Sequence, residues 1–271
     1  KTSSLLLATG AMALALTSSA TAQGRLIAVD SSRALYEIDM TTGAKTSIGT
    51  VGSNAGTTAG LAYDPLGNEM YLTTTGNDSL YSLDLATGNA TLIGAYGDTS
   101  IVMHGLEWDS STGKLFGLSS HNQGLYSIDK VTGAATLIGT NSTTTSFGNL
   151  VHNTATNTMY STSSGDDSFY SIDRTTGART LIGALTGPTN PNGLAYNFDN
   201  GLTYMVDNNT DTLYTINLTT GAATAIGSTG SGNLLGLAYV NPVPEPTTMT
   251  LVGLAGFAAW LDLTPADPDV L

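Results

Sequence analysis

A repeated unit restricts the fold of this chain more than any other feature. Each copy contains a motif of the type Leu-Tyr-Ser-Ile-Asp, whose tyrosines stand 45, 45, 44 and 44 residues apart. The five tyrosines are Tyr36, Tyr81, Tyr126, Tyr170 and Tyr214. A Thr-Gly pair and then an Ile-Gly pair follow every copy of this motif. Five copies in register predict a repeat architecture in which each unit has the same structure.

Each unit contains four short runs that favour β-strands. The first has the form Gly-Leu-Ala-Tyr, the second resembles residues 70–72, the third is the tyrosine motif, and the fourth ends in Ile-Gly. These runs are rich in β-branched and aromatic residues and lack helical periodicity. Four antiparallel strands per unit are typical of a β-propeller blade, so we predict an all-β, five-bladed propeller over residues 23–242. An open β-solenoid is the alternative.

The phase of the repeat predicts how the ring closes. No Gly-Leu-Ala-Tyr run precedes the second strand of the first unit, and a copy of that run at residues 235–240 follows the last unit. We therefore expect this final strand to pair with residues 26–29 and complete the first blade, which removes an unpaired edge. In the turn before each fourth strand, the Asp that ends the tyrosine motif, replaced by Asn217 in the last unit, is expected to accept backbone amides and a Gly to adopt positive φ.

The predicted ring places several aspartates on one of its two faces. The first strand of each blade lies nearest the axis, and the connections from fourth to first and from second to third strands share what we call the acidic face. Its candidate ligand-binding residues are Asp78, Asp98, Asp166, Asp167, Asp207 and Asp211. They would suit a sugar or a cation such as calcium, the one cofactor this face would allow. The alternative is that they are turn formers.

Two further candidates lie on or beside a predicted innermost strand. His104 directly precedes the Gly-Leu motif of its unit, and Glu107 stands where other units carry Ala62 or Ala195. Because a buried carboxylate without a partner is costly, Glu107 is expected to meet water, a cation or His104. His152 replaces an aromatic residue of the other units, so we interpret it as a packing residue and expect no histidine metal site.

The first 22 residues have the pattern of a secretory signal peptide. Lys1 is followed by an uncharged, mostly apolar run over residues 5–16 and then by small residues that end in Ala22. We expect signal peptidase to cleave after Ala22. A short buried helix is the alternative interpretation.

The C-terminal part, residues 243–271, contains the triplet Pro244, Glu245 and Pro246 and then an uncharged run over residues 247–261. This pattern resembles the PEP-CTERM sorting signal of exported bacterial proteins. The resemblance implies recognition by an exosortase, transient anchoring in the inner membrane by a transmembrane helix, and delivery to the cell envelope or extracellular matrix. The arginine cluster that ends the family's signal is missing, and three aspartates stand there. An ordinary apolar C-terminal helix is the alternative.

Charge and composition exclude several classes of function. The chain has 8 Lys and Arg against 21 Asp and Glu, for a net charge of −13, and it has no cysteine. An acidic chain is poorly suited to nucleic acid, since that affinity comes from basic residues, and thiolate chemistry is absent. No nucleophile elbow, P-loop or HExxH motif is present. We therefore expect an exported, non-catalytic binding or structural module that recognises polysaccharide or a cation.

The alternative function is a glycoside hydrolase or lyase with carboxylates at the axial mouth of the propeller. Glu107, His104 and Asp98 are the candidates for such a role. The two functions make different structural predictions, because hydrolysis needs two carboxyl groups about 5–10 Å apart in a cleft.

Overall fold

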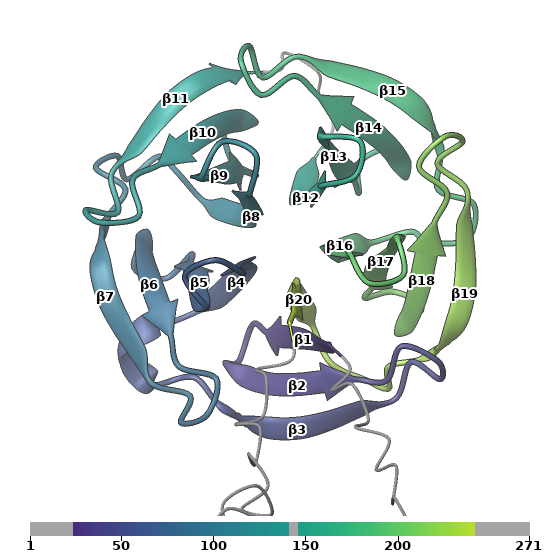
Figure 1. Ribbon diagram of the computed structural model, residues 1–271, viewed down its shortest axis with the longest axis horizontal. Coiled ribbons are helices and arrows are strands. Elements are labelled where there is room, and N and C mark those ends of the chain that lie inside the picture. Colours follow the sequence, from purple (N-terminus) through teal and green to yellow (C-terminus); the bar gives the residue numbers. More distant parts are fainter. Residues whose placement is uncertain (1–23, 141–145, 242–271) are drawn as a thin grey trace, which may run out of the picture. The chain divides into compact units, whose positions relative to one another are not determined.

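The computed structural model describes residues 24–140 and 146–241, which form one compact unit over 24–241. Five four-stranded antiparallel sheets stand in a ring around a central axis (Figure 1). The predicted five-bladed β-propeller is confirmed. The predicted signal peptide and sorting segment, which include Ala22 and the triplet Pro244, Glu245 and Pro246, lie outside the described residues.

Each blade runs outward from the axis through four strands. Blade one contains β20 (Leu234–Val240), β1 (Arg25–Asp30), β2 (Ala34–Ile38) and β3 (Lys45–Thr50). Blade two contains β4 (Thr58–Asp64), β5 (Glu69–Thr74), β6 (Ser79–Leu83) and β7 (Ala90–Ala95), and a 3-10 turn, η1 (Ser53–Ala55), precedes it. Blade three contains β8 (Met103–Asp109), β9 (Lys114–Ser119), β10 (Gly124–Ile128) and β11 (Ala135–Thr140). Blade four contains β12 (Phe147–Asn153), β13 (Thr158–Ser163), β14 (Ser168–Ile172) and β15 (Arg179–Ala184). Blade five contains β16 (Pro191–Asn197), β17 (Leu202–Asp207), β18 (Thr212–Ile216) and β19 (Ala223–Ser228).

The last strand closes the ring as the repeat phase predicts. β20 pairs antiparallel with β1, from Arg25 opposite Val240 to Asp30 opposite Leu234. All seven residues of β20 are buried. The first blade is therefore built from both ends of the described chain, and the ring has no open radial edge.

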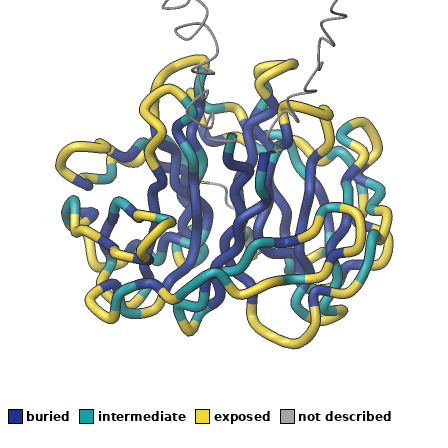
Figure 2. Tube along the Cα trace, turned by 60° about the horizontal axis from the view of Figure 1, so that its bottom comes forward, coloured by how far each residue is buried: buried dark blue, intermediate teal, exposed yellow. Residues whose placement is uncertain are grey.

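The apolar core lies between neighbouring blades. One cluster joins Ile27 and Val29 of blade one to Leu61 and Leu72 of blade two, and four further clusters fill the other interfaces. The buried strands run through the middle of the ring, while the exposed connections gather at its two ends (Figure 2). Alternating side chains of a strand reach opposite faces of the sheet, so each inner strand contributes to two interfaces.

The aspartate of the tyrosine motif shapes the turn between the third and fourth strands, as predicted. The Asp39 carboxylate accepts hydrogen bonds from the Thr41 hydroxyl at 2.6 Å and the Thr41 amide at 2.7 Å. These bonds hold the pKa of Asp39 below its usual value. Gly43, the glycine of the following Thr-Gly pair, has a φ of +77°. The turn therefore explains why both residues recur at the same place in the repeat.

The Thr-Gly and Ile-Gly pairs fit together across blade boundaries. In the outer strand β11, Gly139 pairs with Leu125 of β10 and Leu137 pairs with Tyr126 of β10. The residue between them in β11 is therefore bulged out of register. Gly139 lies against the turn of the next blade, where an added Cβ would stand 2.0 Å from the Thr176 carbonyl oxygen. Gly94, Gly183 and Gly227 lie equally close to the carbonyls of Thr132, Thr220 and Thr42. The bulge also distorts the outer edge of the sheet, which disfavours pairing with a strand of another chain.

We expect Gly139→Ala to lower the free energy of unfolding by about 1–3 kcal/mol, because the new methyl group must displace the backbone of blade four. Urea denaturation followed by circular dichroism measures the change. Gly148→Ala is the matched control, since its Cβ would meet only the Pro191 carbonyl oxygen at 3.7 Å, an ordinary contact. Equal midpoints for the two variants would contradict a tight contact between the blades.

Candidate functional site

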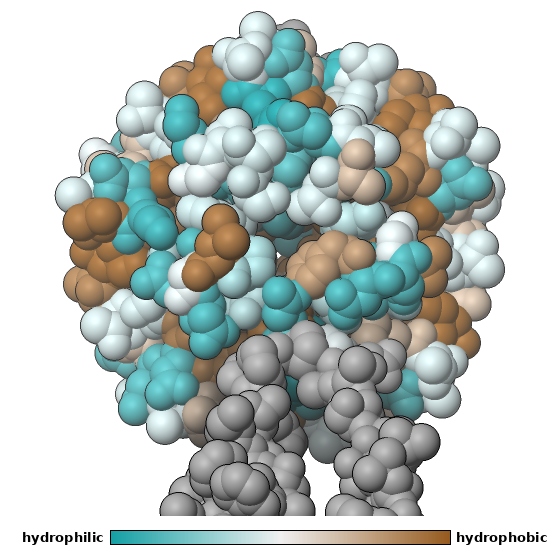
Figure 3. All heavy atoms as spheres, in the orientation of Figure 1, coloured by the Kyte–Doolittle hydropathy of each residue, from teal (hydrophilic) through white to brown (hydrophobic). Residues whose placement is uncertain are grey.

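A small cavity lies on the axis, at the end of the ring that is opposite to the acidic face. All five innermost strands line it, and Tyr63, Glu107, His152, Tyr196 and Tyr239 are among its wall residues. Its volume is about 50 Å³. Viewed from this end, the surface of the ring is a mosaic of hydrophilic and hydrophobic residues (Figure 3). The cavity therefore admits a small chemical group.

The repeat itself brings aromatic residues to this end of the axis. The last residue of the Gly-Leu-Ala-Tyr motif is Tyr63, Trp108, His152, Tyr196 or Tyr239 in the five units, and all five line the cavity. Phe198, in the connection after β16, also lines it and packs edge-on against Tyr239 at 5.0 Å between ring centroids. The repeat pattern alone shows this aromatic position but does not place a site there.

Glu107 is the one carboxyl group among the described residues that line the cavity. Its side chain accepts a hydrogen bond from the Trp108 amide at 3.1 Å and another from the His152 backbone. Burial raises the pKa of Glu107 well above its ordinary value of 4.5. Within the described part of the chain, no hydrogen bond or ion pair joins Glu107 to His104 or to a basic side chain. Of the three expected partners of Glu107, His104 is therefore not in contact with it among the described residues.

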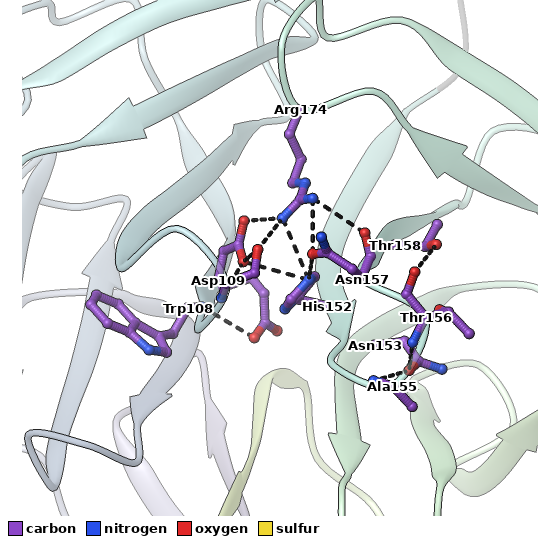
Figure 4. A network of polar contacts seen from close by, with 11 residues as sticks. Trp108, Asp109, His152, Asn153, Ala155, Thr156, Asn157, Thr158 and Arg174 are labelled. Atoms are coloured by element: carbon purple, nitrogen blue, oxygen red, sulfur yellow. Dashed lines mark hydrogen bonds and ion pairs between the residues drawn. The ribbon is translucent and has the colours of Figure 1, made fainter.

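A buried ionic network lies beside the cavity, between blades three and four (Figure 4). Asp109 is fully buried and forms an ion pair with Arg174, which reaches inward from the turn after β14. Arg174 also donates to the Asn157 carbonyl oxygen at 3.2 Å. The His152 Nε2 atom is 3.0 Å from Asn157 Oδ1 and 3.5 Å from Asp109 Oδ1. His152 is nearly inaccessible, and burial lowers its pKa, which agrees with a packing role.

The charges of this network are matched between blades at equivalent positions of the repeat. Where the innermost strand ends in Asp64, the next blade supplies Lys130, whose Nζ is 3.4 Å from Asp64 Oδ2. Where the strand ends in Asn197, the next blade supplies Met40, whose Sδ lies 3.4 Å from the amide nitrogen. Asp109 and Arg174 follow the charged version of this pattern. The network therefore has a structural explanation that does not require a ligand.

The candidates on the acidic face are engaged in forming its turns. Asp78, Asp167 and Asp211 have φ values of +48°, +49° and +46°. Asp207 is buried and accepts backbone amides from four different residues, Thr189 at 2.9 Å, Asn190 at 2.6 Å, Asn209 at 3.1 Å and Thr210 at 2.8 Å. These contacts fit the turn-forming alternative better than a ligand site.

The remaining two acidic-face candidates also have local partners. Asp98 accepts the Ser100 amide at 2.8 Å, and Asp166 accepts the Tyr170 hydroxyl at 2.5 Å. Among the described residues, no three His, Asp or Glu side chains come together as metal ligands would. The structure therefore does not gather the carboxylates of this face into one site.

The burial of Glu107 predicts an unusual pH dependence of stability. The group binds its proton more tightly in the folded protein, so stability is complete below the ordinary pKa of 4.5 and falls as pH rises towards the folded pKa. Asp109 on the same strand adds to this effect, since its charge also disfavours ionisation of Glu107. We expect Glu107→Gln to gain about 1.4 kcal/mol over the parent per pH unit in that window.

Urea denaturation from pH 4 to pH 8 measures this difference between the parent and the variant. Glu69→Gln serves as the control, because Glu69 is exposed. A constant difference between Glu107→Gln and the parent across this range would show that Glu107 ionises as freely in the folded chain as in the unfolded one.

Comparisons with known proteins support the fold. A family model described as a repeat of unknown function, DUF6923, matches residues 119–232. No curated protein matches the sequence at a significant level. Within residues 24–140 and 146–241, no helix has the length and apolar character that a membrane crossing requires.

Several solved structures have a similar fold. A chain of a nidogen/laminin complex is 14% identical with a TM-score of 0.55, over 79% of this chain and 83% of that one. A structural genomics protein of unknown function from Bacteroides thetaiotaomicron is 19% identical with a TM-score of 0.55, over 84% and 63%. A catalytically inactive virginiamycin B lyase from Staphylococcus aureus, solved with quinupristin, is 14% identical with a TM-score of 0.50, over 84% and 80%. At these identities the likeness establishes the propeller fold alone.

Proposed function

We propose that this protein is a non-catalytic binding module whose ligand enters the axial cavity. The observation that carries the proposal is the carboxyl group of Glu107 in a cavity that is lined mostly by aromatic and apolar residues. The equivalent residues of the other blades are Ala62, Val151, Ala195 and Ala238. A carboxyl group at this depth destabilises the fold relative to alanine, so a role in recognition would explain it.

The alternative of a hydrolase or lyase has less support. A glycoside hydrolase needs two carboxyl groups that flank the scissile bond. Among the described residues that line the cavity, Glu107 is the one acid, and the adjacent Asp109 is occupied by Arg174 and Ser111. His104 and Asp98 are absent from the cavity wall. The proposed ligand is instead a polysaccharide or another polar molecule that is bound and released unchanged.

The proposal includes export to the cell envelope or extracellular matrix. Its support is the signal-like pattern of residues 1–22 and the PEP-CTERM-like pattern of residues 243–271, which would engage signal peptidase and an exosortase. Mass spectrometry of the protein recovered from the envelope and from the medium tests this part. We expect a mature chain that begins at Gln23, and an untrimmed chain in the cytoplasm would contradict it.

Isothermal titration calorimetry with a panel of soluble polysaccharides, and with calcium chloride, tests the binding function. We expect the parent to bind a member of the panel and Glu107→Ala to bind it at least tenfold more weakly, since alanine occupies this position in three other blades. Asp98→Asn, on the acidic face, should bind like the parent. A loss confined to Asp98→Asn would move the site to the acidic face, and no binding by the parent would leave a scaffold role.

A further inference from the structure

We infer that the axial cavity recognises an ammonium group of its ligand, with the Glu107 carboxyl group, which releases its proton to solvent as the cation enters, as the counter-ion. This inference rests on the proposed binding function and specifies the chemistry of the group that enters the cavity. It follows from the partners that other buried carboxylates have, from the walls of the cavity and from its size.

Four carboxylates are deeply buried in the described part of the chain, and two of them have a basic partner. Asp64 is paired with Lys130, and Asp109 is paired with Arg174. The other two have no cation there and are held by hydrogen bonds. Asp207 accepts four backbone amides and a hydroxyl, and Asp30 accepts two backbone amides and two hydroxyls. Glu107 accepts two backbone amides and has no basic partner among the same residues. A buried carboxylate is stable when it is paired and hydrogen-bonded, so Glu107 lacks a cation that a ligand could supply.

The walls of the cavity favour a positive charge over a negative one. Aromatic side chains line it on several sides, including Tyr63, Tyr196 and Tyr239, and no Lys or Arg is among its described wall residues. Aromatic rings attract ammonium groups through their electron-rich faces, and a nearby carboxylate adds to that attraction. The net charge of −13 also raises the local concentration of cations.

The size and donor set of the cavity select among cations. A volume of about 50 Å³ admits a group comparable to a few water molecules, which fits an ammonium head. Calcium requires six to eight oxygen ligands, and no cluster of three ligating side chains occurs in the described residues. An organic ammonium therefore fits the site better than a divalent metal ion.

An amino sugar and a lysine side chain both carry this chemistry, and calorimetry with the full chain separates them. The probes are methylammonium chloride, glucosamine, N-acetylglucosamine and an Nα-acetyl-lysine amide. We expect glucosamine to bind at least tenfold more tightly than N-acetylglucosamine, whose amide is neutral. The stronger of glucosamine and the lysine amide identifies the source of the ammonium group, and methylammonium shows that the group suffices.

Two variants of the same size as the parent residue give the decisive comparison. Glu107→Gln keeps the shape of the side chain and removes its ability to ionise, so the preference for glucosamine should disappear. Glu69→Gln removes an exposed charge that does not line the cavity and should leave the preference intact. A thermal melt of each variant confirms that it is folded.

The possible failures are distinguishable. Equal binding of glucosamine and N-acetylglucosamine, both weakened by Glu107→Gln, would overturn the ammonium inference and leave the proposed binding function standing. A preference for glucosamine that survives in Glu107→Gln would also overturn it. If no amine binds while a neutral polysaccharide binds at the same cavity, the ammonium inference is overturned and the binding function stands. If neither the probes nor the polysaccharides bind, both proposals are overturned.

Discussion

Replacing Arg174 by methionine should lower the free energy of unfolding by about 3–5 kcal/mol, the largest effect we expect from a single substitution. Asp109 is fully buried, and Arg174 is its cationic partner from the next blade. Without the guanidinium group, the carboxylate must either remain charged in the blade interface or take up a proton. Both outcomes favour the unfolded chain, in which Asp109 is hydrated.

The repeat supplies its own control for this prediction. Asn197 and Met40 occupy the same two positions between blades five and one, where the amide nitrogen lies 3.4 Å from the sulfur. The double variant Asp109→Asn with Arg174→Met copies that pair, so it should recover most of the lost stability. Urea denaturation of the parent, both single variants and the double variant completes the cycle. Additive losses would mean that Asp109 and Arg174 do not interact.

Lys130→Met tests the equivalent contact in which the cation is more exposed to water. The Lys130 side chain is 41% exposed, its Nζ is 3.4 Å from Asp64 Oδ2, and it also approaches Glu69. Because this lysine is partly hydrated in the folded protein, its contact with Asp64 is screened by water. We therefore expect the free energy of unfolding to fall by about 1 kcal/mol instead of several. The comparison separates burial from charge as the cause of the Arg174 effect.

The architecture was predictable because five copies of the repeat carry the same pattern of four strands. The spacing of Tyr36, Tyr81 and the later tyrosines gives the number of blades, and the displaced copy at residues 235–240 gives the closure. The structural role of Asp39 and its equivalents also followed from the sequence, since the turn depends on residues that are close in the chain.

The location of the cavity was not predictable to the same degree. Glu107 stood out because its repeat neighbours are alanines, but the aspartates of the sequence favoured the acidic face, whereas the cavity is at the other end. Which end of the axis stays open depends on how side chains from five strands fill the space, and no local pattern records that. The pairing of Asp109 with Arg174 joins residues from two blades. Predicting it would have required knowing how neighbouring blades are placed relative to each other.

The role of β20 gives the second large prediction. A chain that ends at Asn233 should lose cooperative unfolding altogether, whereas a chain that ends at Asn241 should retain it. β20 contributes seven buried residues and pairs with β1 over its whole length. It also packs against the innermost strands β4 and β16 of both neighbouring blades. Without it, the apolar surfaces of three blades and the edge of β1 are exposed to water.

Thermal unfolding followed by circular dichroism compares the two truncated chains with the parent. A synthetic peptide of residues 234–241 provides the sharper test, because it can add to β1 as a strand supplied in trans. We expect the peptide to restore a cooperative transition in the chain that ends at Asn233, and a peptide with Gly236→Val to fail, since a Cβ at Gly236 would stand 2.4 Å from the Ala59 carbonyl oxygen. An unchanged melting temperature after loss of β20 would mean that four complete blades and a three-stranded remnant hold the ring without closure. The ring stability would then come from the individual blade interfaces, as in an open repeat array, and the closing strand would serve only to complete the wall of the axial cavity.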